Sequence, residues 1–187
     1  MDPTDPTDPT NPTARTIGRL RDAASGFAGF RSAIEAGRPW PSHVIDHDAG
    51  PESEWGPTEV LAHVTEMLPF WLGEIERILD GAPEPVPFGR TATDRLRIMT
   101  IERDRTLPPT ELLDRIGAGV ERYARRLDRL SASDLARRGL HPSLGEVSVA
   151  NALERFVVSH AEGHVIQLAE TLGPGTVDDV RATEGEA

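Results

Sequence analysis

The sequence contains no cysteine and no lysine, and aromatic residues make up only 5% of its 187 residues. Without cysteine the chain cannot form a disulfide or offer a metal ion a thiolate ligand, and any thiol in its chemistry must come from another molecule. No apolar run approaches the roughly 20 residues of a membrane-spanning helix. The first residues also lack the positive charge and the apolar stretch of a signal peptide. We therefore expect a cytoplasmic protein with no membrane partner.

The chain is acidic, because 31 Asp and Glu residues outweigh 20 Arg residues and give a net charge of −11. Nucleic-acid-binding surfaces need clustered cations, so this balance argues against a nucleic-acid partner. With 37% hydrophobic residues, 187 residues suffice to bury one core. We expect a small-molecule substrate as the partner, and an outer helix face could also support a homodimer.

Composition divides the chain into three segments. Residues 1–13 read MDPTDPTDPTNPT, and such a Pro/Asp/Thr repeat is typical of a disordered tail because it offers no side chain for burial. Residues 174–187 indicate a second, flexible acidic tail. Residues 14–173 are then expected to form the folded domain.

Within that domain, apolar residues recur at helical spacing. The pattern predicts helices at about 14–36, 57–80, 109–130 and 149–172, each about 33–37 Å long. Matched lengths and one apolar face on each helix are typical of a four-helix bundle. The segment 81–108 is long enough to cross the bundle, which makes the second and third helices parallel. The expected fold is therefore all-α, with an up-down-down-up order and no pair of strands.

Three histidines are candidate metal ligands. His160 and His164 stand four residues apart on the fourth helix, so their rings share one face at a spacing that suits one ion. His63 lies on the inward face of the second helix. At 1.5 Å per residue, antiparallel helices bring all three to a similar level, whereas parallel helices would separate them by about 9–15 Å. The alternative is that they are core histidines that hydrogen-bond to neighbouring groups.

Other histidines and aromatics fit less specific interpretations. His43 and His47 are also four residues apart, but they lie between prolines where at most one helical turn fits, so we expect a loop or surface position. His141 precedes a proline and is expected in a turn. Phe70 and Trp71 fit core or interface positions better than a cofactor site.

Several polar residues could support the histidines. Glu66 follows His63 by one turn and Gln167 follows His164 by one turn, so either could orient an imidazole or touch a substrate. The alternative for each is a solvated polar side chain. Arg97, Arg103 and Arg105 could meet an anionic thiol cofactor, although a solvated face is the favoured interpretation.

Three segments together resemble the DinB-like superfamily of bacterial four-helix bundles in order and spacing. They are WGPTEVLAHV (55–64), HPSLGEVSV (141–149) and SHAEGHVIQL (159–168). The resemblance spans roughly residues 14–172, and it implies that the family's three metal ligands fall on His63, His160 and His164. It also implies a divalent metal, zinc or nickel, as the cofactor.

Several branches of this family resemble transferases or isomerases that use a low-molecular-weight thiol such as mycothiol or bacillithiol. The branch of mycothiol-dependent maleylpyruvate isomerases has a carboxylate at the position of His160, so this sequence is more similar to the all-histidine branch. Three imidazoles leave a metal an open position at which a thiol could be activated. We therefore expect a metal-dependent thiol S-transferase with an unknown electrophilic substrate. The alternatives are a metal-dependent hydrolase in the same site and a non-catalytic stress-response or interaction bundle.

Overall fold

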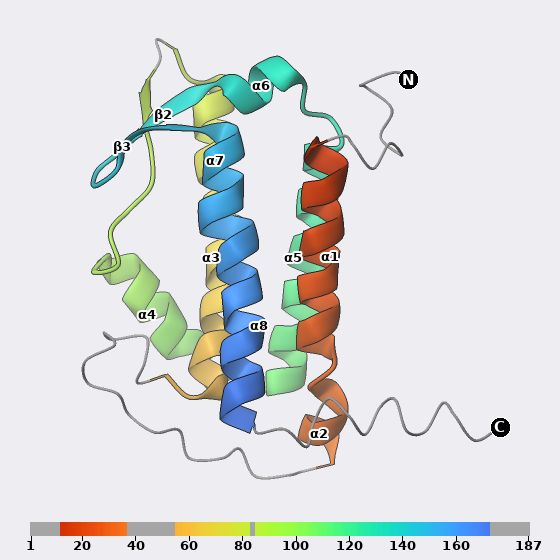
Figure 1. Ribbon diagram of the computed structural model, residues 1–187. Coiled ribbons are helices and arrows are strands. Elements are labelled where there is room, and N and C mark those ends of the chain that lie inside the picture. Colours follow the sequence, from red (N-terminus) through yellow and green to blue (C-terminus); the bar gives the residue numbers. More distant parts are fainter. Residues whose placement is uncertain (1–11, 37–54, 83–84, 173–187) are drawn as a thin grey trace, which may run out of the picture.

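The protein is described by a computed structural model over residues 12–36, 55–82 and 85–172. Four long helical stretches lie side by side, and a small sheet with a short helix covers one end of them (Figure 1). The expected tails lie outside the described residues, except that Pro12 and Thr13 form the start of the first helix.

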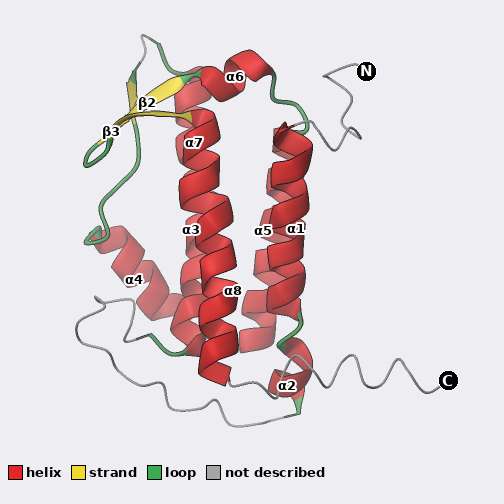
Figure 2. Cartoon of the chain, in the orientation of Figure 1, coloured by secondary structure: helices red, strands yellow, loops and turns green. Residues whose placement is uncertain are grey.

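Helices account for most of the described chain, and the strands are confined to one end (Figure 2). The elements in chain order are α1 (Pro12–Ala28), α2 (Arg31–Glu35), α3 (Pro57–Asp80), β1 (Val86–Pro87), α4 (Arg95–Asp104), α5 (Pro109–Leu127), α6 (Ala132–Ala136), β2 (Arg138–His141), β3 (Gly145–Ser148), α7 (Val149–Leu153), the π-helical turn η2 (Glu154–Val158) and α8 (Ser159–Leu172).

The bundle has the predicted up-down-down-up order. In Figure 1, α3 and α5 run in the same direction, while α1 and the continuous α7–η2–α8 stretch run in the opposite direction. The parallel pair is possible because the crossover between α3 and α5, which contains β1 and α4, returns the chain to the end at which α3 began. Within the described ranges, no helix is long and apolar enough to cross a membrane.

Apolar side chains from all four long stretches form one core. Leu61, Leu112 and Val157 are each fully buried, as are many of their neighbours. Burying one such side chain contributes about 1.5–3 kcal/mol relative to leaving it in water. The periodic stripes of the sequence therefore face inward as predicted.

The first predicted helix is interrupted. The prediction placed one helix at about 14–36, but α1 ends at Ala28 and α2 begins at Arg31. At the break, the Phe30 backbone N–H donates to the carbonyl of Phe27 three residues earlier, at 3.1 Å. This tighter turn redirects the chain at Gly29 and still leaves the Phe30 side chain buried.

The fourth predicted helix begins where expected but is not uniform. Ser148 caps it by accepting a hydrogen bond from the Asn151 backbone N–H at 3.2 Å. The π-helical turn η2 then adds one residue to the turn, so that Val157 and Val158 are both buried while Phe156 is only partly buried. Such turns arise where an α-helix accommodates an extra residue, and they are frequent at functional sites.

The expectation that the chain has no paired strands is wrong. Strands β1, β2 and β3 form a sheet in that order, in which β1 is parallel to β2 and β2 is antiparallel to β3. These strands have only two to four residues, too few to show the alternation that predicts a strand. Gly145 closes the β2–β3 turn with a φ of 72°, a conformation that favours glycine.

The sheet and the crossover are tied to the end of α3. The Arg137 guanidinium donates to the carbonyls of Leu79 and Gly81, which satisfies carbonyl groups at the C-terminal end of the helix. The Gly89 backbone N–H donates to the buried carboxylate of Glu74 at 2.5 Å. These contacts hold the crossover against α3, the helix that carries His63.

Replacing Gly139 with alanine is expected to destabilise the protein by about 1–3 kcal/mol, because an added Cβ overpacks a filled site. That Cβ would lie 2.8 Å from the Ile78 Cδ1 atom and would also meet the Phe88 ring. Urea unfolding followed by circular dichroism measures the change.

The matched control is Gly73→Ala in the interior of α3, where nothing lies within 4 Å of the added Cβ. This variant should be more stable than the wild type by about 0.5–1 kcal/mol, since alanine favours a helix over glycine. Equal stability of Gly139→Ala and the wild type would show that β2 does not pack closely on α3.

Candidate metal centre

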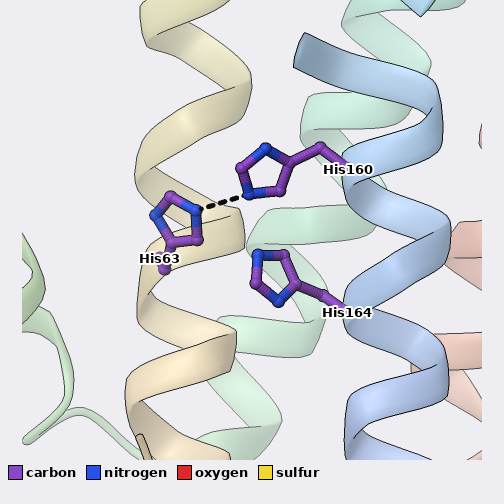
Figure 3. Close-up of side chains that lie close together, drawn as sticks. All are labelled: His63, His160 and His164. Carbon is purple, nitrogen blue, oxygen red and sulfur yellow. Dashed lines mark hydrogen bonds between the residues drawn. The ribbon is translucent and has the colours of Figure 1, made fainter. Parts of the chain in front are cut away.

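Three imidazoles converge between α3 and α8. Figure 3 shows the His63 ring extending from α3 toward the rings of His160 and His164 on α8. One nitrogen from each ring lies within 4.8 Å of the other two, and the ring centroids are 4.7–5.1 Å apart. His63 and His164 are 2% and 5% exposed, whereas His160 is only partly buried.

The spacing of the imidazole nitrogens suits a shared ion. The Nε2 atoms of His63 and His160 are 3.0 Å apart. Two bonds of about 2.1 Å that leave one ion at 90–110° place their nitrogens about 3.0–3.4 Å apart. A third nitrogen within 4.8 Å is close enough to join them after a small rotation of its ring. The donor set therefore fits zinc or nickel, both of which accept imidazole nitrogen.

His164 is held by a residue one turn further along α8. Its Nδ1 atom is 2.8 Å from the Gln167 Oε1 atom, and since this oxygen only accepts, the Nδ1–H of His164 donates to it. That bond fixes the tautomer in which Nε2 carries the lone pair. Gln167 thus lies where an orienting residue is expected.

Burial favours the neutral form of His63 and His160. It lowers the pKa of His63 well below the ordinary value of 6.5, and the imidazoles of His164 and His160 lower that pKa further. The pKa of His160 falls to about 4, mainly through burial and then through the His164 imidazole. Because only a neutral imidazole binds a metal, both rings are in the competent form at neutral pH.

A buried ion pair lies beside His63. The Arg90 guanidinium donates to the Glu66 carboxylate at 2.6 Å, and both side chains are at most 10% exposed. The same carboxylate lies 3.9 Å from the His63 Nδ1 atom, beyond hydrogen-bond distance. On another side, the Trp55 ring centroid lies 5.0 Å from that of His63. Glu66 is therefore near the cluster, as predicted, but its direct partner is Arg90.

A pocket of about 400 Å³ opens next to the imidazoles of His63 and His160. Three arginines line it: Arg90 and Arg97 from the crossover and Arg155 from η2. Arg97 is only 7% exposed. No carboxylate is among the described residues that line the pocket.

The apolar wall of this pocket is aromatic. The rings of Trp71 and Phe156 stack at a centroid distance of 4.3 Å and an interplanar angle of 7°. His141 packs on Phe156 at 5.0 Å and accepts a hydrogen bond at Nδ1 from the Ser143 backbone N–H. His141 ends β2 rather than lying within a turn, and it is not part of the three-histidine cluster.

Of the other described histidines and arginines considered from the sequence, only one lies at the pocket. His43 and His47 lie outside the described residues. Arg103 pairs with the neighbouring Asp104, and Arg105 pairs with Glu59, so neither is among the residues that line the pocket. Of the three crossover arginines considered from the sequence, only Arg97 reaches it.

Two residues that line the pocket, Arg90 and Arg155, could not be identified from the sequence. Arg90 lies in an irregular stretch of the crossover, and no periodic pattern points to it. Arg155 precedes Phe156 within η2, so its position depends on a π-helical turn that helical periodicity does not predict.

Comparison with known proteins agrees with this architecture. The structure is similar to that of YfiT from Bacillus subtilis, described as a "probable metal-dependent hydrolase with an unusual four-helix bundle topology", with a TM-score of 0.63, 16% sequence identity and coverage of 85% of each chain. None of the curated proteins searched gives a match. Residues 6–168 match the family described as the DinB superfamily. This chain therefore belongs to the DinB superfamily.

Proposed function

We propose that His63, His160 and His164 bind one divalent metal ion and that the protein is a metal-dependent hydrolase. The observation that carries the proposal is the convergence of three imidazole nitrogens within 4.8 Å at the wall of a pocket. Three imidazoles leave a tetrahedral ion with one open position, as in catalytic rather than structural zinc sites. The description of YfiT as a metal-dependent hydrolase supports the same reaction class.

A divalent ion bound here would supply a water molecule with a pKa lowered to about 7, or it would lower the pKa of a thiol in the same way. The chain's own residues would orient the metal ligands and line the pocket. Gln167 holds the His164 ring in register through Nδ1. Trp55 packs against the His63 ring, and Trp71 and several crossover residues line the pocket.

The second candidate is the thiol S-transferase expected from the sequence. The absence of cysteine is compatible with it, since a thiol nucleophile would then enter as a separate molecule. The pocket volume of about 400 Å³ lies within the range of small-molecule sites. The two candidates share the metal and differ in the nucleophile, so one set of assays separates them.

The tag-free protein should bind about one equivalent of zinc or nickel per chain, and His160→Ala should lose most of this binding because a ligand is removed. His160 is the only partly buried member of the cluster, so its replacement threatens folding least. Elemental analysis after dialysis measures the metal, and hydrolysis of a panel of esters and amides should decrease in parallel.

The control is His141→Gln, which changes a buried imidazole outside the cluster and should leave the metal content unchanged. Adding mycothiol to the assays separates the candidates: turnover without thiol supports the hydrolase, and turnover only with thiol supports the transferase. A wild-type protein that is free of metal after equilibration with zinc and nickel would refute both.

Gln167→Leu should weaken metal binding by about 10–100-fold, the usual cost of losing the group that orients a ligand imidazole. The substitution removes the acceptor of the His164 Nδ1–H and leaves the three ligands in place. Competition with a chelator measures the affinity. Gln167→Glu keeps an acceptor oxygen and should retain the wild-type affinity or exceed it, and equal weakening in both variants would argue against an orienting role.

The metal-free protein should lose stability as the pH falls from about 6.5 toward 4. In this window the unfolded chain protonates histidines whose folded-state pKa values are lowered, namely His63 and His160. The unfolded state then binds more protons than the folded state, so stability decreases with falling pH. The contribution of His160 to this decline levels off below about pH 4, and that of His63 only below its own lowered pKa.

Thermal unfolding of the metal-free protein across this pH range measures the effect. His160→Ala should show a shallower decline, since one of the titrating groups is absent. An identical pH profile in the variant and the wild type would contradict the assignment.

A further inference from the structure

One imidazole nitrogen of the cluster is buried without a hydrogen bond. The His63 side chain is 2% exposed, and its Nδ1 atom has no hydrogen-bond partner among the described residues. The Nε2 atom of the same ring faces His160, whose Nε2 atom lies 3.0 Å away (Figure 3). If Nε2 offers its lone pair to the cluster, Nδ1 carries the hydrogen, because a neutral imidazole has one donor and one acceptor nitrogen. A buried donor of this kind is costly to leave without an acceptor.

A buried carboxylate lies beside this nitrogen. Glu66 follows His63 by three residues on α3, so the two side chains share one face of the helix. A Glu66 carboxylate oxygen is 3.9 Å from the His63 Nδ1 atom, about 1 Å longer than a hydrogen bond. The Glu66 side chain is only 8% exposed, so solvent does not readily reach either group. A small rotation of the carboxylate would bring it within hydrogen-bond distance of Nδ1.

The carboxylate of Glu66 has capacity for this second hydrogen bond. Within the described part of the chain, Arg90 is the one residue that donates to it, at 2.6 Å. A carboxylate accepts up to about four hydrogen bonds through its two oxygens. Arg90 is itself fixed, because its guanidinium lies over the Phe70 ring at 3.6 Å. The ion pair therefore holds Glu66 beside His63 and leaves lone pairs for the imidazole.

We propose that Glu66 is the positioning residue of His63. Its carboxylate keeps the hydrogen of the His63 ring on Nδ1 and accepts that hydrogen when the cluster holds a metal ion, while the pair with Arg90 persists. This inference deepens the proposed function and rests on the proposed metal site. A carboxylate behind a ligand imidazole fixes the orientation and tautomer of the ring and makes the other nitrogen a stronger ligand. Gln167 accepts the Nδ1–H of His164 in the same way, so each helix would supply an acceptor for its own buried ligand.

A second role for Glu66 has to be separated from this one. Arg90 is only 10% exposed, and a buried guanidinium needs a counter-charge. If Glu66 served only to neutralise Arg90, it would no longer matter for the metal once Arg90 is replaced by a neutral residue. If Glu66 positions His63, its effect on the metal persists without Arg90.

The test measures zinc affinity by competition with a chelator for Glu66→Gln in two backgrounds, the wild type and Arg90→Gln. Glutamine has nearly the size of glutamate but carries no charge. Glu66→Gln should weaken zinc binding by about tenfold in both backgrounds, the lower end of the usual cost of changing the group behind a ligand imidazole. An effect that disappears in the Arg90→Gln background would overturn the proposal.

The matched control is Glu74→Gln, which removes another carboxylate of α3 whose side chain is also 8% exposed. Glu74 pairs with Arg77 and accepts from the Gly89 backbone N–H, so it contacts no histidine of the cluster. Its replacement should leave zinc affinity unchanged. Equal weakening by Glu66→Gln and Glu74→Gln would point to a general effect of charge and would also overturn the proposal.

Nitrogen NMR of histidine-labelled protein follows the His63 ring directly. In the zinc-loaded wild type, the Nδ1 atom of His63 should carry a slowly exchanging hydrogen. Glu66→Gln should speed this exchange and leave the signals of His164 unchanged, a selective change that a merely structural role would not produce. A His63 ring that binds zinc through Nδ1 and carries its hydrogen on Nε2 would overturn the proposal.

The metal function and the role of Glu66 can fail separately. If neither zinc nor nickel binds the wild type, the metal function fails, and the metal-free protein decides on Glu66. A hydrogen on Nδ1 of His63 that exchanges faster in Glu66→Gln then supports the pairing, and a hydrogen on Nε2 overturns it. If zinc binds and Glu66→Gln changes neither the affinity nor the Nδ1 signal, the metal function stands and the role of Glu66 fails.

Discussion

The site depends on the antiparallel arrangement of α3 and α8. His63 lies near the N-terminal end of α3, and His160 and His164 lie on α8, so only opposed helices bring them together. Burying three imidazoles is costly unless each finds a partner. A common metal ion would satisfy that requirement at one point. The register of α3 against α8 therefore decides whether these three histidines can act as one site.

This constraint could be derived from the sequence. Helical periodicity is local, so the ends of α3 and the start of the fourth helical stretch were predicted to the residue, including Pro57 and the Ser148 cap. The length of the crossover predicted the parallel pair, and residue counting then placed the three histidines at one level. This last step used only the rise of 1.5 Å per residue, so it required no knowledge of side-chain packing.

The features that escaped prediction depend on contacts between distant segments. Strands β1 and β2 pair across about 50 residues of chain and are too short to show a pattern of their own. Arg90 reaches the pocket because Glu66 and Glu74 hold the crossover against α3. The turn η2 lies where the consecutive residues Val157 and Val158 are both buried in the core. A regular helical stripe does not predict that two consecutive residues are both buried.

The bundle and the crossover contribute different groups to the candidate site. The bundle supplies the three imidazoles, and the crossover supplies Arg90 and Arg97 to the pocket wall. A fold shared at 16% identity, as with YfiT, therefore carries no information about this wall. Since loops change more readily than packed helices, proteins of this fold could keep one metal centre and differ in the ligand beside it.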